Sequence, residues 1–95
     1  METDYLQIKR KILTILKRNG IARAGLFGSI VRGEDTENSD IDILVEFSDK
    51  KSLLDLARLK LTLEESLDRH VDIITYNSIN PLLRDRILQE QEVLI

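Results

Sequence analysis

Three aspartates, Asp40, Asp42 and Asp72, have the residue type and the spacing to hold a divalent cation. In a strand, Asp40 and Asp42 would point to the same face, with Cα atoms roughly 6.5–7 Å apart. Asp72 interrupts the apolar run Val71–Thr75, where a lone carboxylate is costly to bury. Mg²⁺ prefers carboxylate oxygens and shares itself with substrate phosphates. The three aspartates therefore predict a site for one or two Mg²⁺ ions.

The short stretch around Gly28 and Ser29 has residue types suited to phosphate binding. A glycine lets the backbone approach a phosphate closely, and free amides at the start of a helix attract anions. Arg32 would stand about one helical turn further on, where its guanidinium can reach a phosphate. A simpler interpretation remains open for each: a turn in which Ser29 caps a helix, and a solvated surface arginine.

Hydrophobic periodicity predicts the elements that must position these groups. In chain order they are a helix at 4–18, a strand at 21–27, a helical turn in 28–33, a strand at 41–47, a helix at 52–67, a strand at 71–75 and a helix that begins at Asn80-Pro81. The order α-β-(α)-β-α-β-α predicts an α+β fold, a small mixed β-sheet flanked by helices. We expect a single domain over residues 1–95, because this length suffices for one compact unit.

Each amphipathic element is expected to bury one face. In helix 52–67 the expected stripe is Leu53, Leu56, Ala57, Leu63 and Leu67, with Leu59 and Leu61 at its margins. In the last helix it is Leu83, Ile87 and Leu94, and the ending EVLI either frays or adds a short extension. In strand 41–47, one face carries Ile41, Ile43, Val45 and Phe47, and the other carries Asp40, Asp42, Leu44 and Glu46.

The connections between strands predict where the polar groups meet. Strands 21–27 and 41–47 are joined by a segment too short for a full crossover, which favours an antiparallel pair. Strands 41–47 and 71–75 are separated by a helix, which permits a right-handed parallel crossover. This topology brings Gly28-Ser29, the first two aspartates and Asp72 to one sheet edge. Each aspartate alone also fits a turn or a hydrogen-bonded structural role, but their joint placement favours a site.

Composition narrows the classes of protein that fit. The net charge of −3 disfavours nucleic-acid binding, and the chain has no cysteine for a disulfide or a thiolate metal site. No apolar run approaches the roughly 20 residues of a membrane span, and no signal-peptide core follows Met1. We therefore expect a cytoplasmic protein that does not enter a membrane.

The stretch GSIVRGEDTENSDID, residues 28–42, places Gly-Ser ten residues before an Asp-any-Asp motif. This pattern resembles the polymerase-β-type nucleotidyltransferase superfamily. More closely, the chain resembles the minimal nucleotidyltransferases (MNT), antitoxins encoded beside HEPN-domain toxins in prokaryotes. The segments VDIIT and INPLLRDRIL resemble that subfamily too, so that the similarity covers about residues 25–88.

The resemblance implies a role for each motif residue. Gly28 and Ser29 would hold the nucleotide phosphates, and Asp40 and Asp42 would ligate two Mg²⁺ ions. Asp72 would complete the metal site and help to deprotonate the incoming hydroxyl. The family's antitoxins transfer AMP from ATP to a tyrosine hydroxyl of the partner HEPN toxin, with which they form a hetero-oligomer.

The role of the partner protein leaves alternatives open. A binding-only antitoxin would neutralise the toxin by occlusion, although the intact set of carboxylates argues against it. The expected sheet and helices account for nearly all 95 residues, so we expect another protein to offer the acceptor. The partner surface is expected on helix 52–67 or the C-terminal helix, unless their leucines serve only as core.

Overall fold

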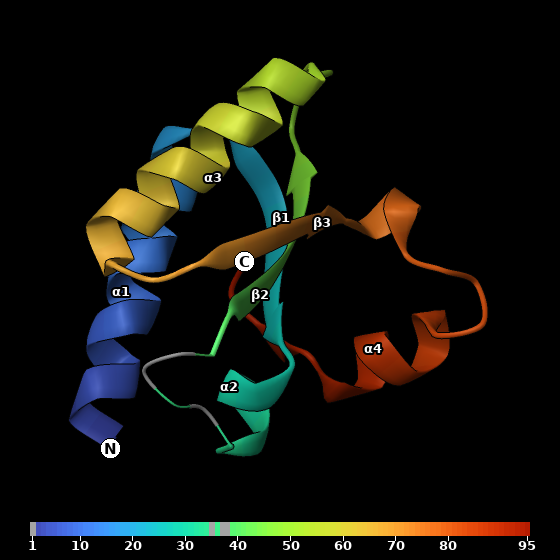
Figure 1. The fold of residues 1–95 in the computed structure, drawn as a ribbon. Helices are drawn as coiled ribbons and strands as arrows, with labels where there is room; N and C mark the ends of the chain where they lie inside the picture. Colours follow the sequence, from blue (N-terminus) through green and yellow to red (C-terminus); the bar gives the residue numbers. More distant parts are fainter. Residues whose placement is uncertain (1, 35, 37–38) are drawn as a thin grey trace.

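A four-stranded mixed sheet organises the chain in the computed structural model, which describes residues 2–34, 36 and 39–95. The elements are α1 (Glu2–Arg18), β1 (Ile21–Phe27), α2 (Ser29–Arg32), β2 (Ile41–Phe47), α3 (Leu53–Leu67), β3 (Val71–Thr75), the 3-10 turn η1 (Tyr76–Ser78), α4 (Arg84–Glu90) and β4 (Glu92–Val93). Helices α1 and α3 lie against one face of the sheet, and η1 and α4 lie on the opposite side (Figure 1). The predicted α+β fold class is confirmed.

The strand order is β3-β2-β1-β4. Strand β1 pairs antiparallel with β2, and β2 pairs parallel with β3, as the connection lengths predict. The fourth strand, β4, pairs antiparallel with β1 through Gly25 and Leu26. Its two residues belong to the ending EVLI, so the short extension is the correct alternative.

The alternation along β2 separates a main core from a smaller one. Ile41, Ile43 and Val45 are fully buried in the main cluster, together with Ile12 and Leu16 of α1 and Leu59 and Leu63 of α3. Leu44 faces the other way and packs with Tyr76 and Ile79. Each large aliphatic side chain buried in this way stabilises the fold by roughly 1.5–3 kcal/mol relative to full exposure. Both predicted faces of this strand are confirmed.

The predicted stripe of α3 is partly wrong. Leu59 and Leu63 are the buried residues, whereas Leu53 is 84% exposed and Ala57 is also exposed. The first turn of α3 lies beyond the ends of the strands, where no sheet is available to cover it (Figure 1). This end is stabilised locally instead, by a capping box between Ser52 and Asp55.

The last helix begins later than predicted. The Leu82 amide donates to the Asn80 side chain at 2.9 Å and the Leu83 amide to the Asn80 carbonyl at 2.9 Å, so a turn precedes α4. Leu83 is consequently 47% exposed. Leu94 lies beyond the helix and packs against the main cluster, with its amide 2.8 Å from the Ala24 carbonyl oxygen. Both residues were wrongly assigned to the buried face of this helix.

Candidate active site

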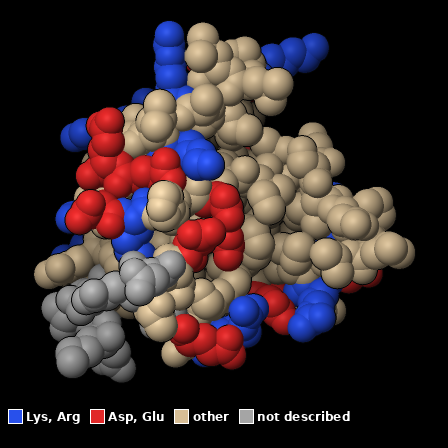
Figure 2. Space-filling model, in the orientation of Figure 1, with Lys and Arg blue, Asp and Glu red and all other residues tan. Residues whose placement is uncertain are grey.

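Asp42 and Asp72 lie side by side on the sheet. They are register partners in the parallel pair β2–β3, so their side chains occupy the same face on neighbouring strands. Adjacent strands are about 4.8 Å apart, which brings the two carboxylates together. Asp42 is half-buried and Asp72 is exposed. Asp40 is exposed and directly precedes β2, outside its ladder. Figure 2 shows acidic side chains gathered near the middle of this face, with Lys and Arg side chains flanking them.

Gly28 connects β1 to this carboxylate pair. Asp42 is the register partner of Phe27 across β1–β2, so the residue that follows Phe27 lies against the Asp42 side chain. Gly28 has a φ of 83°, and a Cβ built on it would clash with Oδ2 of Asp42. Both the backbone conformation and the close approach therefore require glycine here.

Ser29 is the first residue of α2 and is half-buried. The N-cap of α2 is Gly28, and the cap makes no side-chain hydrogen bond. The interpretation of Ser29 as a helix N-cap is therefore wrong. Its carbonyl oxygen instead accepts from the amides of Gly33 and Glu34, which closes the short helix.

The electrostatics of Asp42 reflect its crowded position. Burial, the neighbouring Asp72 and then Asp40 raise the pKa of Asp42 from 3.8 to about 6, while the Arg32 guanidinium acts in the opposite direction. Asp42 therefore interacts electrostatically with both of the other predicted carboxylates. A divalent cation would relieve their mutual repulsion, and their oxygens are the donors that Mg²⁺ prefers. The residues present thus fit Mg²⁺, although no three His, Asp or Glu side chains converge as a formed metal centre within the described part of the chain.

Arg32 lies among three carboxylates rather than alone at the surface. Its Nε is 3.3 Å from Oε2 of Glu34, its Nη1 is 3.8 Å from Oε2 of Glu90, and its charge partly offsets the rise in the pKa of Asp42. The side chain is 46% exposed, so it remains accessible to a ligand. Glu90 comes from α4 and carries no signal in the sequence that connects it to this site.

Two anchoring residues were missed by sequence reasoning. Arg69 donates from Nη2 to the carbonyl oxygens of Thr36 and Ser39, at 2.9 and 2.6 Å. Glu64 of α3 accepts from the Val71 amide at 3.0 Å, which lowers the pKa of its carboxyl. These contacts hold the chain where β2 and β3 begin, next to the aspartates. The Arg69 contacts join residues 30 or more positions apart, and the Glu64 contact spans the turn between α3 and β3, so no periodic pattern predicts them.

Comparison with known proteins identifies the family. The sequence profile described as "Polymerase beta, Nucleotidyltransferase" matches residues 10–95. The chain belongs to this nucleotidyltransferase family. The family resemblance seen in residues 28–42 is thereby confirmed. No helix in the part of the chain that the structure describes combines the length and the apolar character needed to cross a membrane.

This nucleotidyltransferase is also similar to individual relatives and solved structures. It is 63% identical over 84 residues to a Methanocaldococcus jannaschii protein named as a candidate protein adenylyltransferase, a match that covers 88% of this chain and 90% of that protein. A chain of a toxin–antitoxin structure with AMP-PNP superposes with a TM-score of 0.81 and 29% identity, covering 92% of this chain and 72% of that chain.

A second solved complex contains a tri-AMPylated Shewanella oneidensis HEPN toxin and an MNT antitoxin. A chain of that complex superposes with a TM-score of 0.76 and 25% identity, covering 96% of this chain and 71% of that chain. The fold expected from the resemblance is thus the fold of chains found in toxin–antitoxin assemblies.

Proposed function

We propose that this nucleotidyltransferase is an Mg²⁺-dependent protein adenylyltransferase that transfers AMP from ATP to a tyrosine hydroxyl of a partner HEPN toxin, and so acts as its antitoxin. The observation that carries the proposal is the placement of Asp42 beside Asp72, with Gly28 packed against Asp42. The relatives support the choice of reaction and partner, since one is named for protein adenylylation and another is a complex with an AMPylated HEPN toxin. We place the reaction in the cytoplasm, where ATP is abundant.

The carboxylates of Asp40, Asp42 and Asp72 are the groups that would hold Mg²⁺. The chemistry that Mg²⁺ supplies when bound is a lower pKa for the acceptor hydroxyl and stabilisation of the charge that develops on phosphate. Two observations support this assignment: Asp42 and Asp72 share one face of the sheet, and burial together with the charges of Asp72 and Asp40 raises the pKa of Asp42.

The remaining groups bind and orient the substrates. Gly28 and Ser29 would approach the nucleotide phosphates through their backbone, and Arg32 would donate to a phosphate oxygen. The acceptor oxygen attacks the α-phosphorus, the bond to the bridging oxygen breaks, and pyrophosphate leaves with its electron pair. Asp72 would accept the hydroxyl proton, a role supported by its exposure on β3. The protein contributes mainly positioning and electrostatics to such a transfer.

The test is to incubate the protein with Mg²⁺, a HEPN-domain protein from the same genome and ATP labelled at the α-phosphate. We expect label on a tyrosine of the HEPN protein, and loss of label with Asp40→Ala or Asp42→Ala. Asp49→Ala is the matched control, because Asp49 is an exposed aspartate in the turn after β2. Toxin neutralisation that survives the first two substitutions would identify a binding-only antitoxin. Label on nucleic acid instead would exclude the protein acceptor.

A further inference from the structure

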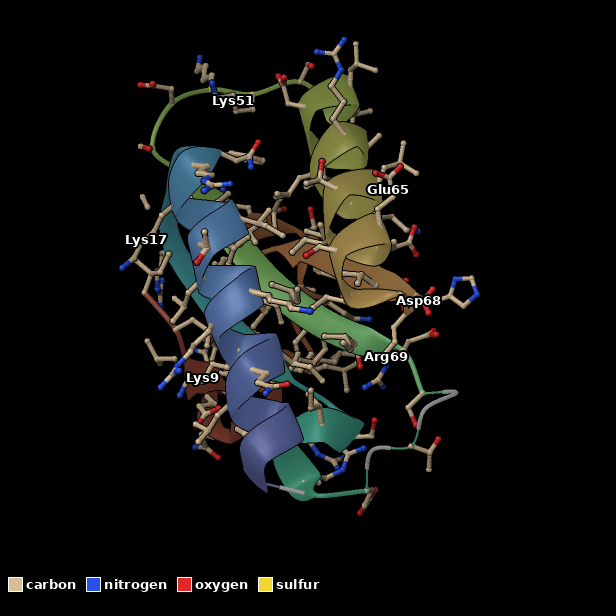
Figure 3. The ribbon with its side chains drawn as sticks, turned by 90° about the vertical axis from the view of Figure 1, so that its left-hand side faces the viewer. Lys9, Lys17, Lys51, Glu65, Asp68 and Arg69 are labelled. Carbon is tan, nitrogen blue, oxygen red and sulfur yellow. The ribbon has the colours of Figure 1, made fainter. Side chains whose placement is uncertain are left out.

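The segment between α3 and β3 directs one side chain toward the site. Asp68 ends α3 in the left-handed conformation, with a φ of 53°, and so turns the chain away from the helix axis. Arg69 follows and is half-buried. Figure 3 shows Arg69 beside the segment that leads into β2, with Asp68 at the outer end of α3. The half-buried guanidinium thus lies next to the residues that precede β2.

The Arg69 guanidinium binds two backbone carbonyls with one nitrogen. Its Nη2 lies 2.9 Å from the Thr36 oxygen and 2.6 Å from the Ser39 oxygen. Thr36 and Ser39 are also linked to each other, because the Ser39 amide donates to the Thr36 carbonyl and the Thr36 amide to the Ser39 hydroxyl, each at 3.0 Å. Arg69 therefore holds Thr36 and Ser39, and Ser39 directly precedes Asp40.

A second link holds the residue after Asp40. The Ile41 amide donates to the His70 carbonyl oxygen at 3.0 Å. Asp40 itself lies outside the β2 ladder, so its backbone position depends on its two neighbours. One neighbour is held by the side chain of Arg69 and the other by the main chain of His70. A single dipeptide thus fixes the backbone on both sides of Asp40.

The same segment also leads directly to Asp72. Glu64 of α3 holds the Val71 amide at 3.0 Å, which sets the start of β3. Residues 69–71 therefore connect the strand that carries Asp72 with the residues on both sides of Asp40. Any displacement of Arg69 would change the position of Asp40 relative to Asp72, while the β2–β3 ladder would still hold Asp42 and Asp72 together.

We propose that Arg69 is a positioning residue, whose guanidinium fixes the carboxylate of Asp40 relative to those of Asp42 and Asp72. This inference rests on the proposed function, because it concerns the same reaction. An arginine suits the role because its planar guanidinium carries several donors in a fixed arrangement and stays charged. A lysine keeps the charge but replaces this arrangement with a flexible point charge.

The test compares Arg69→Met, Arg69→Lys and the control Arg58→Met, which removes an exposed arginine from α3. Loss of a residue that orients a metal ligand typically costs 10–100-fold in metal affinity or activity. In Arg69→Met we therefore expect kcat to fall, or the Mg²⁺ concentration at half-maximal rate to rise, by about 10–100-fold. The KM for ATP should change little. Arg69→Lys should be intermediate, and Arg58→Met should match the wild type.

Two further measurements separate positioning from folding. In the first, activity is expressed per folded molecule, with the folded fraction measured by circular dichroism. In the second, guanidinium at a non-denaturing concentration is added to the Arg69→Ala variant. We expect guanidinium, but not an equal concentration of sodium chloride, to restore part of the activity. An unchanged rate per folded molecule in Arg69→Met would overturn the inference, and so would equal effects of the two salts.

Hydrogen exchange tests the positioning role without measuring the transfer reaction. The Ile41 amide should exchange faster in Arg69→Met than in the wild type, while amides in the middle of β2 should be unaffected. If the wild type transfers no AMP, the proposed function fails, yet the Ile41 amide still reports on Arg69. Unaltered Ile41 exchange in a folded Arg69→Met variant contradicts the positioning role.

Discussion

Replacing Asp42 by asparagine should stabilise the metal-free protein. Asparagine has nearly the same shape as aspartate but carries no charge, so Asp42→Asn removes the repulsion from Asp72 and Asp40. It also removes the cost of burying an ionised carboxylate on the sheet. We therefore expect the variant to lose activity while its free energy of unfolding rises at neutral pH.

The magnitude follows from the pKa of Asp42, which is raised from 3.8 to about 6. Two pKa units correspond to roughly 3 kcal/mol at neutral pH, because each unit is worth about 1.4 kcal/mol. Asp42 is only half-buried, so solvent screening reduces this figure considerably. We expect a gain of about 1 kcal/mol, which in a domain of this size raises Tm by roughly 4–8 °C.

The pH dependence has a definite sign. The folded wild type binds the Asp42 proton more tightly than the unfolded chain does, so its stability falls as the pH rises from about 4 to about 6. The difference between variant and wild type should therefore be small near pH 4, grow across this window and stay constant above it. Below pH 4, aspartate is protonated in both states and resembles asparagine.

The assay is urea unfolding, with a chelator present, at several pH values from 4 to 8. Asp49→Asn is the matched control, since it removes an exposed aspartate at the far end of β2 and should show no such pH-dependent gain. A variant that is less stable than the wild type at pH 7, or a stability difference that does not vary with pH, would refute the reasoning. Added Mg²⁺ should raise the Tm of the wild type more than that of Asp42→Asn.

Four further substitutions have expected outcomes. Gly28→Ala should lower Tm and the transfer rate together, because a methyl group strains the backbone and collides with Asp42; unchanged activity in an activity assay would contradict the close approach. Ser52→Ala should cost about 1 kcal/mol in urea unfolding through loss of the N-cap, and a neutral result would show that the cap contributes nothing. Leu59→Ala should cost about 2–5 kcal/mol and Leu53→Ala less than about 0.5 kcal/mol, and comparable losses in calorimetry would show that the buried face of the helix is misassigned.

The sheet and its aspartate pair were predictable because strands impose strong local rules. Alternation along β2 predicts its two faces, and the lengths of the connections favour an antiparallel β1 and permit a parallel β3. Together these rules place Asp42 beside Asp72 without any knowledge of side-chain packing. The topology of the sheet thus predicts that the end of β1 and the starts of β2 and β3 lie at the same edge.

The features that escaped prediction depend on tertiary contacts. Helix α3 contains seven leucines, so several faces satisfy a helical period, and only the position of the sheet selects Leu59 and Leu63. The link from Arg69 to the turn before β2 joins polar groups about thirty residues apart and has no periodic signature. Strand β4 has two residues, too few for an alternating pattern.

Because β2 carries core residues on one face and Asp42 on the other, the register of the strand determines both the core and the site. Because side chains alternate, a slip of one residue in the pairing of β2 would turn Ile43 out of the main core and Asp42 into it. The energy lost by such a slip far exceeds that of a single contact, since Ile41, Ile43 and Val45 would all leave the main core at once. Burial of the apolar face therefore selects the strand register in which the acidic face is correctly placed. A chain that has buried its isoleucines correctly has, by the same event, aligned the carboxylates of the site.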